Sequence, residues 1–303
     1  MLTRDFLPKH FAEFLFLGGI LGFIFAPFFE GLEWLPKYCL MLNLFLGFLR
    51  IEAADVMTTG RQLPQLLLWS LISIAVIPLM LFFISGSIPE ELRLGLFLMA
   101  ASCAGANAPL LGSLIGLRVL RITAFVILSS LGVIFILPLL IQHLFQTSIA
   151  FDFWEMAFFL SQIVIFPAIV GTLFRRFIPQ AVPKIIPYAG ATGTISMMVL
   201  IGGIVAQNQA FIQIYWWSGM TLWGLFGMCV IFMIRFGMGY VLPAADRTER
   251  WSNGLMFVII NNSLMTLVAL EFFTPAVVWI CLLANIPWIL SFPLMRKYYQ
   301  IKG

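Results

Sequence analysis

The sequence contains few charged residues. Asp, Glu, Lys and Arg make up 10% of its 303 residues, whereas 62% are hydrophobic. A soluble domain carries about 25% charged residues, so a chain of this composition could not cover a water-facing surface with polar groups. The 31 phenylalanines also exclude a disordered chain. We therefore predict an integral membrane protein, with the lipid bilayer as its surroundings.

Residue types that catalysis or nucleotide binding would need are also scarce. The two histidines, His10 and His143, lie at the ends of apolar segments, and no HExxH or Walker A motif occurs. The four cysteines lie inside apolar segments without the spacing of a zinc site. We therefore expect neither an enzyme nor a bound cofactor. The net charge of +4 indicates membrane topology and not nucleic-acid binding.

Ten apolar segments are present, and they are continuously apolar, which favours helices over alternating strands. No charged residue is expected near the centre of any of them, which disfavours a carboxylate-based proton relay. The segments are 11–29, 36–51, 63–85, 92–117, 119–142, 153–175, 184–206, 214–236, 252–272 and 275–295.

The basic residues predict the orientation of these segments. Only Lys37 and Arg93 fall on one side of a ten-span arrangement. The other fifteen of the 17 fall on the opposite side: Arg4, Lys9, Arg50, Arg61, Arg118, Arg121, Arg175, Arg176, Lys184, Arg235, Arg247, Arg250, Arg296, Lys297 and Lys302. Lys and Arg concentrate on the cytoplasmic side, so we predict a multi-pass inner-membrane protein with both termini in the cytoplasm.

The two halves of the chain resemble each other. An offset of 155 residues aligns Asn107 with Asn262 and Pro138 with Pro293. Each half, 1–145 and 150–303, would then hold five spans, and an odd number inverts the second copy in the membrane. Inverted repeats are typical of secondary transporters. The prediction is one transport unit over 1–303 with two inverted five-helix repeats.

Two spans contain sequences that break helices. The fourth has small residues followed by Asn107, Ala108 and Pro109, and Pro disrupts a helix interior. The ninth has Asn261-Asn262-Ser263, whose side chains compete for backbone hydrogen bonds. We expect two broken helices that cross at the midplane, with half-helix N-termini that favour an anion. The alternative is a proline kink and Asn residues that join helices.

These segments supply the predicted substrate site. Asn107, Asn261, Asn262 and Ser263 would bind the substrate together with neighbouring backbone N–H groups, including that of Ala108. Further candidates are Ser113 and Thr266, which alternatively bond back to their own helices, and Thr192 and Thr194 of the seventh span, which line either a cavity or a close helix contact. Gly18 and Gly22 form a GxxxG motif that predicts helix packing.

The chain resembles the bile acid:sodium symporter family. The segments that carry the resemblance are LGLFLMAASCAGANAPLLGSLIGLRVLRITAFVILSS, RTERWSNGLMFVIINNSLMTLVALEFFTPAVVWICLLANIP and RQLPQLLLW. The resemblance implies a panel domain from helices 1, 2, 6 and 7 and a core domain from helices 3–5 and 8–10. It also implies that a small organic anion binds between them, near the crossing of helices 4 and 9, and moves by alternating access, commonly with sodium.

The positions that match the family's sodium ligands differ here. They are Pro109, Leu110, Phe257 and Asn261, of which only Asn261 offers a side-chain oxygen. Uniport, exchange and sodium coupling through an altered site therefore stay open. Cys103 and the paired Asn resemble an arsenite efflux permease, but Leu264 replaces the acidic residue expected there. A channel-like protein or a non-transporting sensor is a further alternative. The sequence leaves the oligomeric state open.

Overall fold

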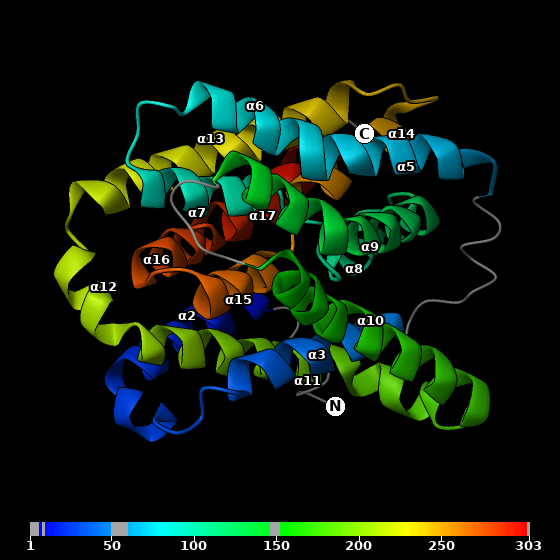
Figure 1. Cartoon of the computed structure of the whole chain (residues 1–303). Coiled ribbons are helices and arrows are strands. Elements are labelled where there is room, and N and C mark those ends of the chain that lie inside the picture. Colours follow the sequence, from blue (N-terminus) through cyan, green and yellow to red (C-terminus); the bar gives the residue numbers. More distant parts are fainter. Residues whose placement is uncertain (1–5, 8–9, 50–59, 146–151, 302–303) are drawn as a thin grey trace. The chain divides into compact units, whose positions relative to one another are not determined.

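The computed structural model describes residues 6–7, 10–49, 60–145 and 152–301 (Figure 1). This part of the chain is helical and forms no strand beyond a single bridged residue pair, which confirms the all-α prediction. The charged residues Arg4, Lys9, Arg50 and Lys302, and the predicted repeat boundary at 146–150, lie outside the described residues.

The described helices form two compact units. Unit 1 comprises Met1–Glu52 and Phe159–Trp216, and unit 2 comprises Ala53–Phe158 and Trp217–Gly303. Unit 1 contains α2 (Phe11–Ile24), η1 (Ala26–Phe29), α3 (Leu35–Phe48), most of α10 (Phe153–Phe177), α11 (Val182–Gln207) and α12 (Gln209–Tyr215). Unit 2 contains η2 (Gly60–Gln62), α5 (Leu63–Leu71), η3 (Ile72–Val76), α6 (Ile77–Ile84), α7 (Glu90–Ala100), α8 (Ala108–Leu114), α9 (Val119–Leu144), α13 (Gly219–Val241), α14 (Arg247–Val258), α15 (Asn262–Phe272), α16 (Pro275–Leu283) and α17 (Asn285–Ile301).

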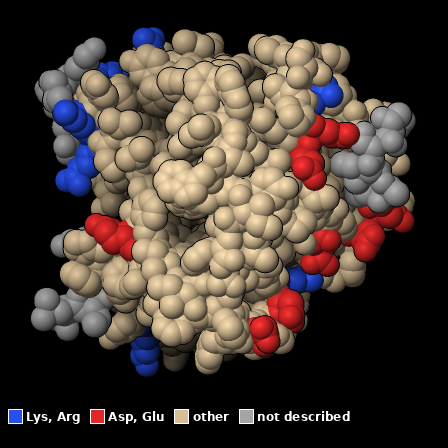
Figure 2. Space-filling model, turned by 90° about the vertical axis from the view of Figure 1, so that its left-hand side faces the viewer, with Lys and Arg blue, Asp and Glu red and all other residues tan. Residues whose placement is uncertain are grey.

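Among the residues that the structure describes, six helical segments are long and apolar enough to cross a membrane. They are Leu63–Ile84, Val119–Leu144, Phe153–Phe177, Val182–Gln207, Gly219–Val241 and Pro275–Tyr299, and three shorter apolar helices accompany them. The fourth and ninth predicted spans are each divided into two helices, and α2 and α3 have 14 residues each. The count of ten spans therefore stays a prediction. On the face shown in Figure 2, charged side chains lie mainly near the margins.

Both predicted helix breaks are present in unit 2. The fourth span is interrupted between the end of α7 at Ala100 and the start of α8 at Ala108. The ninth span is interrupted between the end of α14 at Val258 and the start of α15 at Asn262. Pro109 lies in the first turn of α8, where its missing N–H costs no helical hydrogen bond.

Small residues allow close helix packing in unit 1. A side-chain carbon at Gly22 of α2 would lie 2.1 Å from the carbonyl oxygen of Gly202 in α11. Asn43 of α3 donates to the Gly193 carbonyl at 3.2 Å, and Ser196 donates to the Cys39 carbonyl at 2.7 Å. Gly193 and Ser196 of α11 therefore bond this helix to α3.

Substitution of Gly22 tests this packing. We expect Gly22→Ala to destabilise the protein by about 1–3 kcal/mol, because the added carbon meets backbone atoms that have no side-chain freedom. Gly19→Ala is the matched control on the same helix, since its added carbon would lie 3.9 Å from Ile201 in ordinary contact. Thermal unfolding in detergent measures both variants. Equal midpoints would contradict the close contact between α2 and α11.

Candidate functional site

The two interrupted segments pair with each other. Ala104 and Ile260 form an antiparallel bridge. The Gly105 N–H donates to the Ile259 carbonyl at 2.7 Å, and the Asn261 N–H donates to the Cys103 carbonyl at 2.9 Å. These bonds satisfy backbone N–H and C=O groups that have no helical hydrogen-bond partner at the breaks. The breaks are therefore a defined element of unit 2.

Side chains from other helices hold this element in place. The Ser129 hydroxyl of α9 accepts from the Ala104 N–H at 3.1 Å. The Trp288 indole of α17 donates to the Ile260 carbonyl at 3.1 Å. The Asn261 side chain accepts from the Leu264 N–H at 3.2 Å, which caps α15. The geometry of the breaks is thus specified from several directions.

Arg235 of α13 lies at the centre of this region and is fully buried. Its guanidinium has five N–H groups, and five hydrogen bonds account for the set. Nε donates to the Phe257 carbonyl at 2.6 Å, and one terminal nitrogen donates to the carbonyls of Ser73 at 3.2 Å and Ala100 at 2.6 Å. The other terminal nitrogen donates to the Ser73 hydroxyl at 2.8 Å and the Ser102 carbonyl at 3.1 Å.

The acceptors of Arg235 lie where helices end or loosen. Ala100 is the last residue of α7, and Phe257 lies in the last turn of α14. Ser73 belongs to η3, a π-helical turn. A helix C-terminus carries roughly half a negative charge and unpaired carbonyls. Among the described residues Arg235 has no carboxylate partner within ion-pair distance, so these carbonyls stabilise its charge.

The prediction of no charged residue near the centre of a span does not anticipate that Arg235, at the predicted end of the eighth span, is fully buried. We placed this residue with the charges at the cytoplasmic side because the predicted span ends at 236. The helix α13 extends instead to Val241. An added carbon at Gly239 would lie 2.5 Å from the Asn253 carbonyl, so the bare backbone there lets α14 approach closely. That close packing buries Arg235.

Asn262, the first residue of α15, has a side chain without a hydrogen-bond partner. It is 5% exposed, and neither its amide oxygen nor its amide nitrogen has a partner among the described residues. A buried unpaired polar group costs about 1–3 kcal/mol, and native proteins contain few of them. The Asn262 amide therefore has hydrogen-bonding capacity that no described residue uses.

The other predicted residues of unit 2 differ in their surroundings. Asn107 precedes α8 and is half-buried without capping that helix, and Ala108 is buried. Ser263 is buried at the start of α15. Ser113 donates to the Leu110 carbonyl at 2.7 Å and Thr266 to the Asn262 carbonyl at 2.8 Å, so both bond back to their own helices.

Thr192 and Thr194 belong to unit 1. Thr194 is buried and donates to the Gly190 carbonyl of its own helix at 2.9 Å, whereas Thr192 is exposed. Unit 1 is separate from the unit that holds the helix breaks. Their role in substrate binding stays a prediction.

The residues at the expected sodium positions do not fit a sodium ion. Phe257 is fully buried and stacks on Phe125 with 5.3 Å between ring centroids. Its backbone carbonyl accepts from Arg235. The side-chain oxygen of Asn261 caps α15. Pro109 and Leu110 provide no side-chain oxygen, and hard cations require oxygen ligands.

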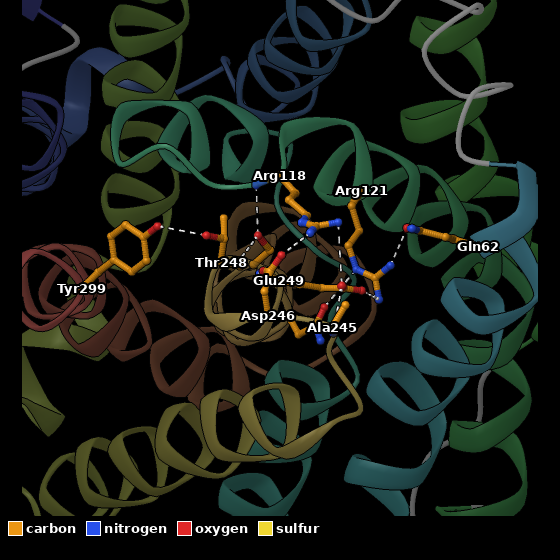
Figure 3. Close-up of polar contacts among 10 residues, drawn as sticks. Gln62, Arg118, Arg121, Ala245, Asp246, Thr248, Glu249 and Tyr299 are labelled. Atoms are coloured by element: carbon orange, nitrogen blue, oxygen red, sulfur yellow. Dashed lines mark hydrogen bonds and ion pairs between the residues drawn. The ribbon is translucent and has the colours of Figure 1, made fainter. Parts of the chain in front are cut away.

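A second polar cluster of unit 2 joins the starts of α9 and α14 (Figure 3). Arg121 is 2% exposed, and its guanidinium lies 3.0 Å from a carboxylate oxygen of the buried Glu249. Arg121 also donates to Asn253 at 3.1 Å and to Gln62 at 2.5 Å, and it lies over the Trp69 ring. The ion pair therefore connects segments that are distant in the sequence.

Asp246 and Arg118 form the outer part of this cluster. Asp246 caps α14, because its carboxylate accepts from the Glu249 N–H at 2.8 Å, and it also pairs with Arg118. The Glu249 N–H and the Arg118 guanidinium together hold the pKa of the Asp246 carboxyl below its usual range. Both partners of this outer pair are exposed, so solvent screens it.

Comparison with known proteins gives two matches. The sequence model of the Sodium Bile acid symporter family matches residues 37–213, more than half of the chain. A protein of Bacillus subtilis (strain 168), described as an uncharacterized sodium-dependent transporter YocS, is 21% identical over 246 residues, which are 78% of this chain and 72% of that protein. Arg235 and Asn262 lie outside the range matched by the family model.

Removing one partner of the buried ion pair tests its contribution to stability. We expect Glu249→Gln to destabilise the protein by about 3 kcal/mol, because the charge of Arg121 then lies buried without a counter-charge. Asp246→Asn is the control; it removes the exposed acid, and Asn also caps helices well, so little change is expected. Thermal unfolding in detergent compares the two. A larger loss for Asp246→Asn would contradict the assignment.

Proposed function

Because the chain belongs to the Sodium Bile acid symporter family, a family of membrane transporters, we propose that it is a secondary transporter of a small organic anion. Membership implies transport and not catalysis. We further propose alternating access, in which unit 1 acts as the panel domain and unit 2 as the core domain. The family membership and the division of the chain into two compact units support this assignment.

The observation that carries the proposal is the buried, unpartnered amide of Asn262. This residue begins α15 next to the paired helix breaks. An amide offers both a donor and an acceptor, so it can recognise a substrate that carries hydroxyl or carboxyl groups. Maintaining such a group without a protein partner has a free-energy cost that substrate binding would offset.

The electrostatics of the same place favour a negative substrate. The start of a helix has unpaired N–H groups and the positive end of the helix dipole. α15 has 11 residues, and in its first turn the Leu264 N–H donates to the Asn261 side chain. Half-helix N-termini bind anionic substrate groups in other transporters. An organic anion therefore fits this end of α15 better than a cation.

The proposed setting is the inner membrane with both termini in the cytoplasm. The asymmetric distribution of Lys and Arg supports this orientation. In this topology the buried pair of Arg121 and Glu249 lies at the cytoplasmic ends of α9 and α14. In the part of the chain that the structure describes, no feature favours a channel, a sensor or an arsenite permease over a carrier.

Substitution of Asn262 separates function from stability. We expect Asn262→Ala to lower uptake by about tenfold or more, because one substrate hydrogen bond is lost. Its thermal stability should stay unchanged or rise, because the removed amide has no partner. Asn208→Ala is the matched control: this buried Asn donates to the Ile204 carbonyl at 2.8 Å, so it should lose stability and retain uptake.

The measurement is uptake of radiolabelled monocarboxylates and dicarboxylates into proteoliposomes. A carrier shows faster exchange when unlabelled substrate is present on the opposite side, whereas a channel does not. Uptake by Asn262→Ala at the wild-type rate would overturn the assignment of Asn262. Uptake without acceleration by counter-substrate would overturn the carrier mechanism.

A further inference from the structure

The guanidinium of Arg235 lies in a shell made of oxygen atoms. Four are backbone carbonyls, those of Ser73, Ala100, Ser102 and Phe257, and the fifth is the Ser73 hydroxyl. These residues come from η3, α7 with the segment after it, and α14. Below we call this set the oxygen shell. No carboxylate of the described residues belongs to the shell. Arg235 and Ser102 are fully buried, so the shell lies away from water.

An oxygen shell of this kind is suited to a monovalent cation. Rings of backbone carbonyls replace the hydration shell of alkali ions in channels. Unwound backbone and the C-terminal ends of half-helices coordinate sodium in transporters. Here the C-terminal ends of α7 and α14 each contribute a carbonyl and the negative end of a dipole. The electrostatic potential of these groups therefore favours a single positive charge.

We propose that Arg235 is a covalently attached cation in a site that otherwise takes a monovalent ion, and that transport consequently does not require sodium. A guanidinium on α13 cannot dissociate, so this site cannot release a cation during the transport cycle. The side chains at the expected sodium positions agree with this, since Phe257 is stacked on Phe125 and Asn261 caps α15. The claim that transport does not require sodium rests on the proposed function. The claim that Arg235 occupies a cation site does not.

Removing the guanidinium should create an ion site that can be measured without transport. We expect Arg235→Ala to unfold at a lower temperature than the wild type in choline chloride, because five oxygen acceptors lose their donor. Sodium or potassium chloride should raise its midpoint by about 5 °C or more in a saturable manner, as expected for ligand binding to the folded state only. Guanidinium chloride at about 10 mM, well below denaturing concentration, should have the same effect.

Matched variants distinguish the site from a general effect of salt. Arg235→Met fills the same space with an apolar chain, so its midpoint should be low and should not respond to sodium. Arg235→Lys keeps a positive charge, so it should be more stable than Arg235→Met and also unresponsive. Arg235→Ser, which also leaves the space open, replaces Arg235→Ala should that variant not fold, and it should respond to sodium.

The wild type provides the remaining measurements. Its midpoint and its uptake rate should be equal in sodium chloride and choline chloride. A saturable stabilisation of the wild type by sodium would overturn the proposal, as would an equal response of Arg235→Met and Arg235→Ala to sodium. Absence of uptake under every condition, with sodium-responsive Arg235→Ala, would instead overturn the proposed function and leave the ion site supported.

Discussion

The structure of unit 2 depends on how the backbone groups freed by two helix breaks are satisfied. In a membrane each unpaired carbonyl costs several kcal/mol because no water replaces the helical hydrogen bond. The break after α7 and the break after α14 bond partly to each other. Three further carbonyls, those of Ala100, Ser102 and Phe257, accept from Arg235, which also reaches the π-helical turn η3. One side chain thus bonds to three interrupted segments and stabilises the breaks, together with the Ser129 and Trp288 side chains.

The two ends of the interrupted helices consequently have different roles. The C-terminal ends of α7 and α14 face a fixed positive charge whose five donors are all used. The N-terminal end of α15 has in Asn262 a buried amide whose donors and acceptor are unused by any residue that the structure describes. A fixed charge with satisfied hydrogen bonds maintains structure, whereas an unsatisfied amide is available for binding. Under the proposed function, separation of these roles within a few residues lets one element combine a fixed charge with a substrate-binding amide.

The sequence predicts the breaks and the close packing of helices for local reasons. Pro109 and the Asn261–Ser263 segment disfavour a continuous helix wherever they lie, and the GxxxG motif at Gly18 and Gly22 permits close approach. The burial of Arg235 follows instead from contacts with Ser73, Ala100 and Phe257, which are distant in the chain. The positive-inside pattern places such a residue at a membrane surface, and no single-sequence pattern distinguishes it from an exposed arginine. A residue's hydrogen-bond partners, and so the unused amide of Asn262, likewise depend on tertiary structure.

Phe257 shows why the fixed cation and the loss of an acidic ligand belong together. By the family resemblance, this position usually supplies a carboxylate to sodium. A carboxylate in place of the Phe257 ring would add a buried negative charge to a residue whose backbone carbonyl already bonds Arg235. It would also give up the stacking of Phe257 on Phe125. Buried ion pairs often stabilise a protein no better than apolar packing does. The Arg235 guanidinium bonds to the C-terminal ends of two helices, the Phe257 ring packs in the core, and under our proposal this site takes no exchangeable ion.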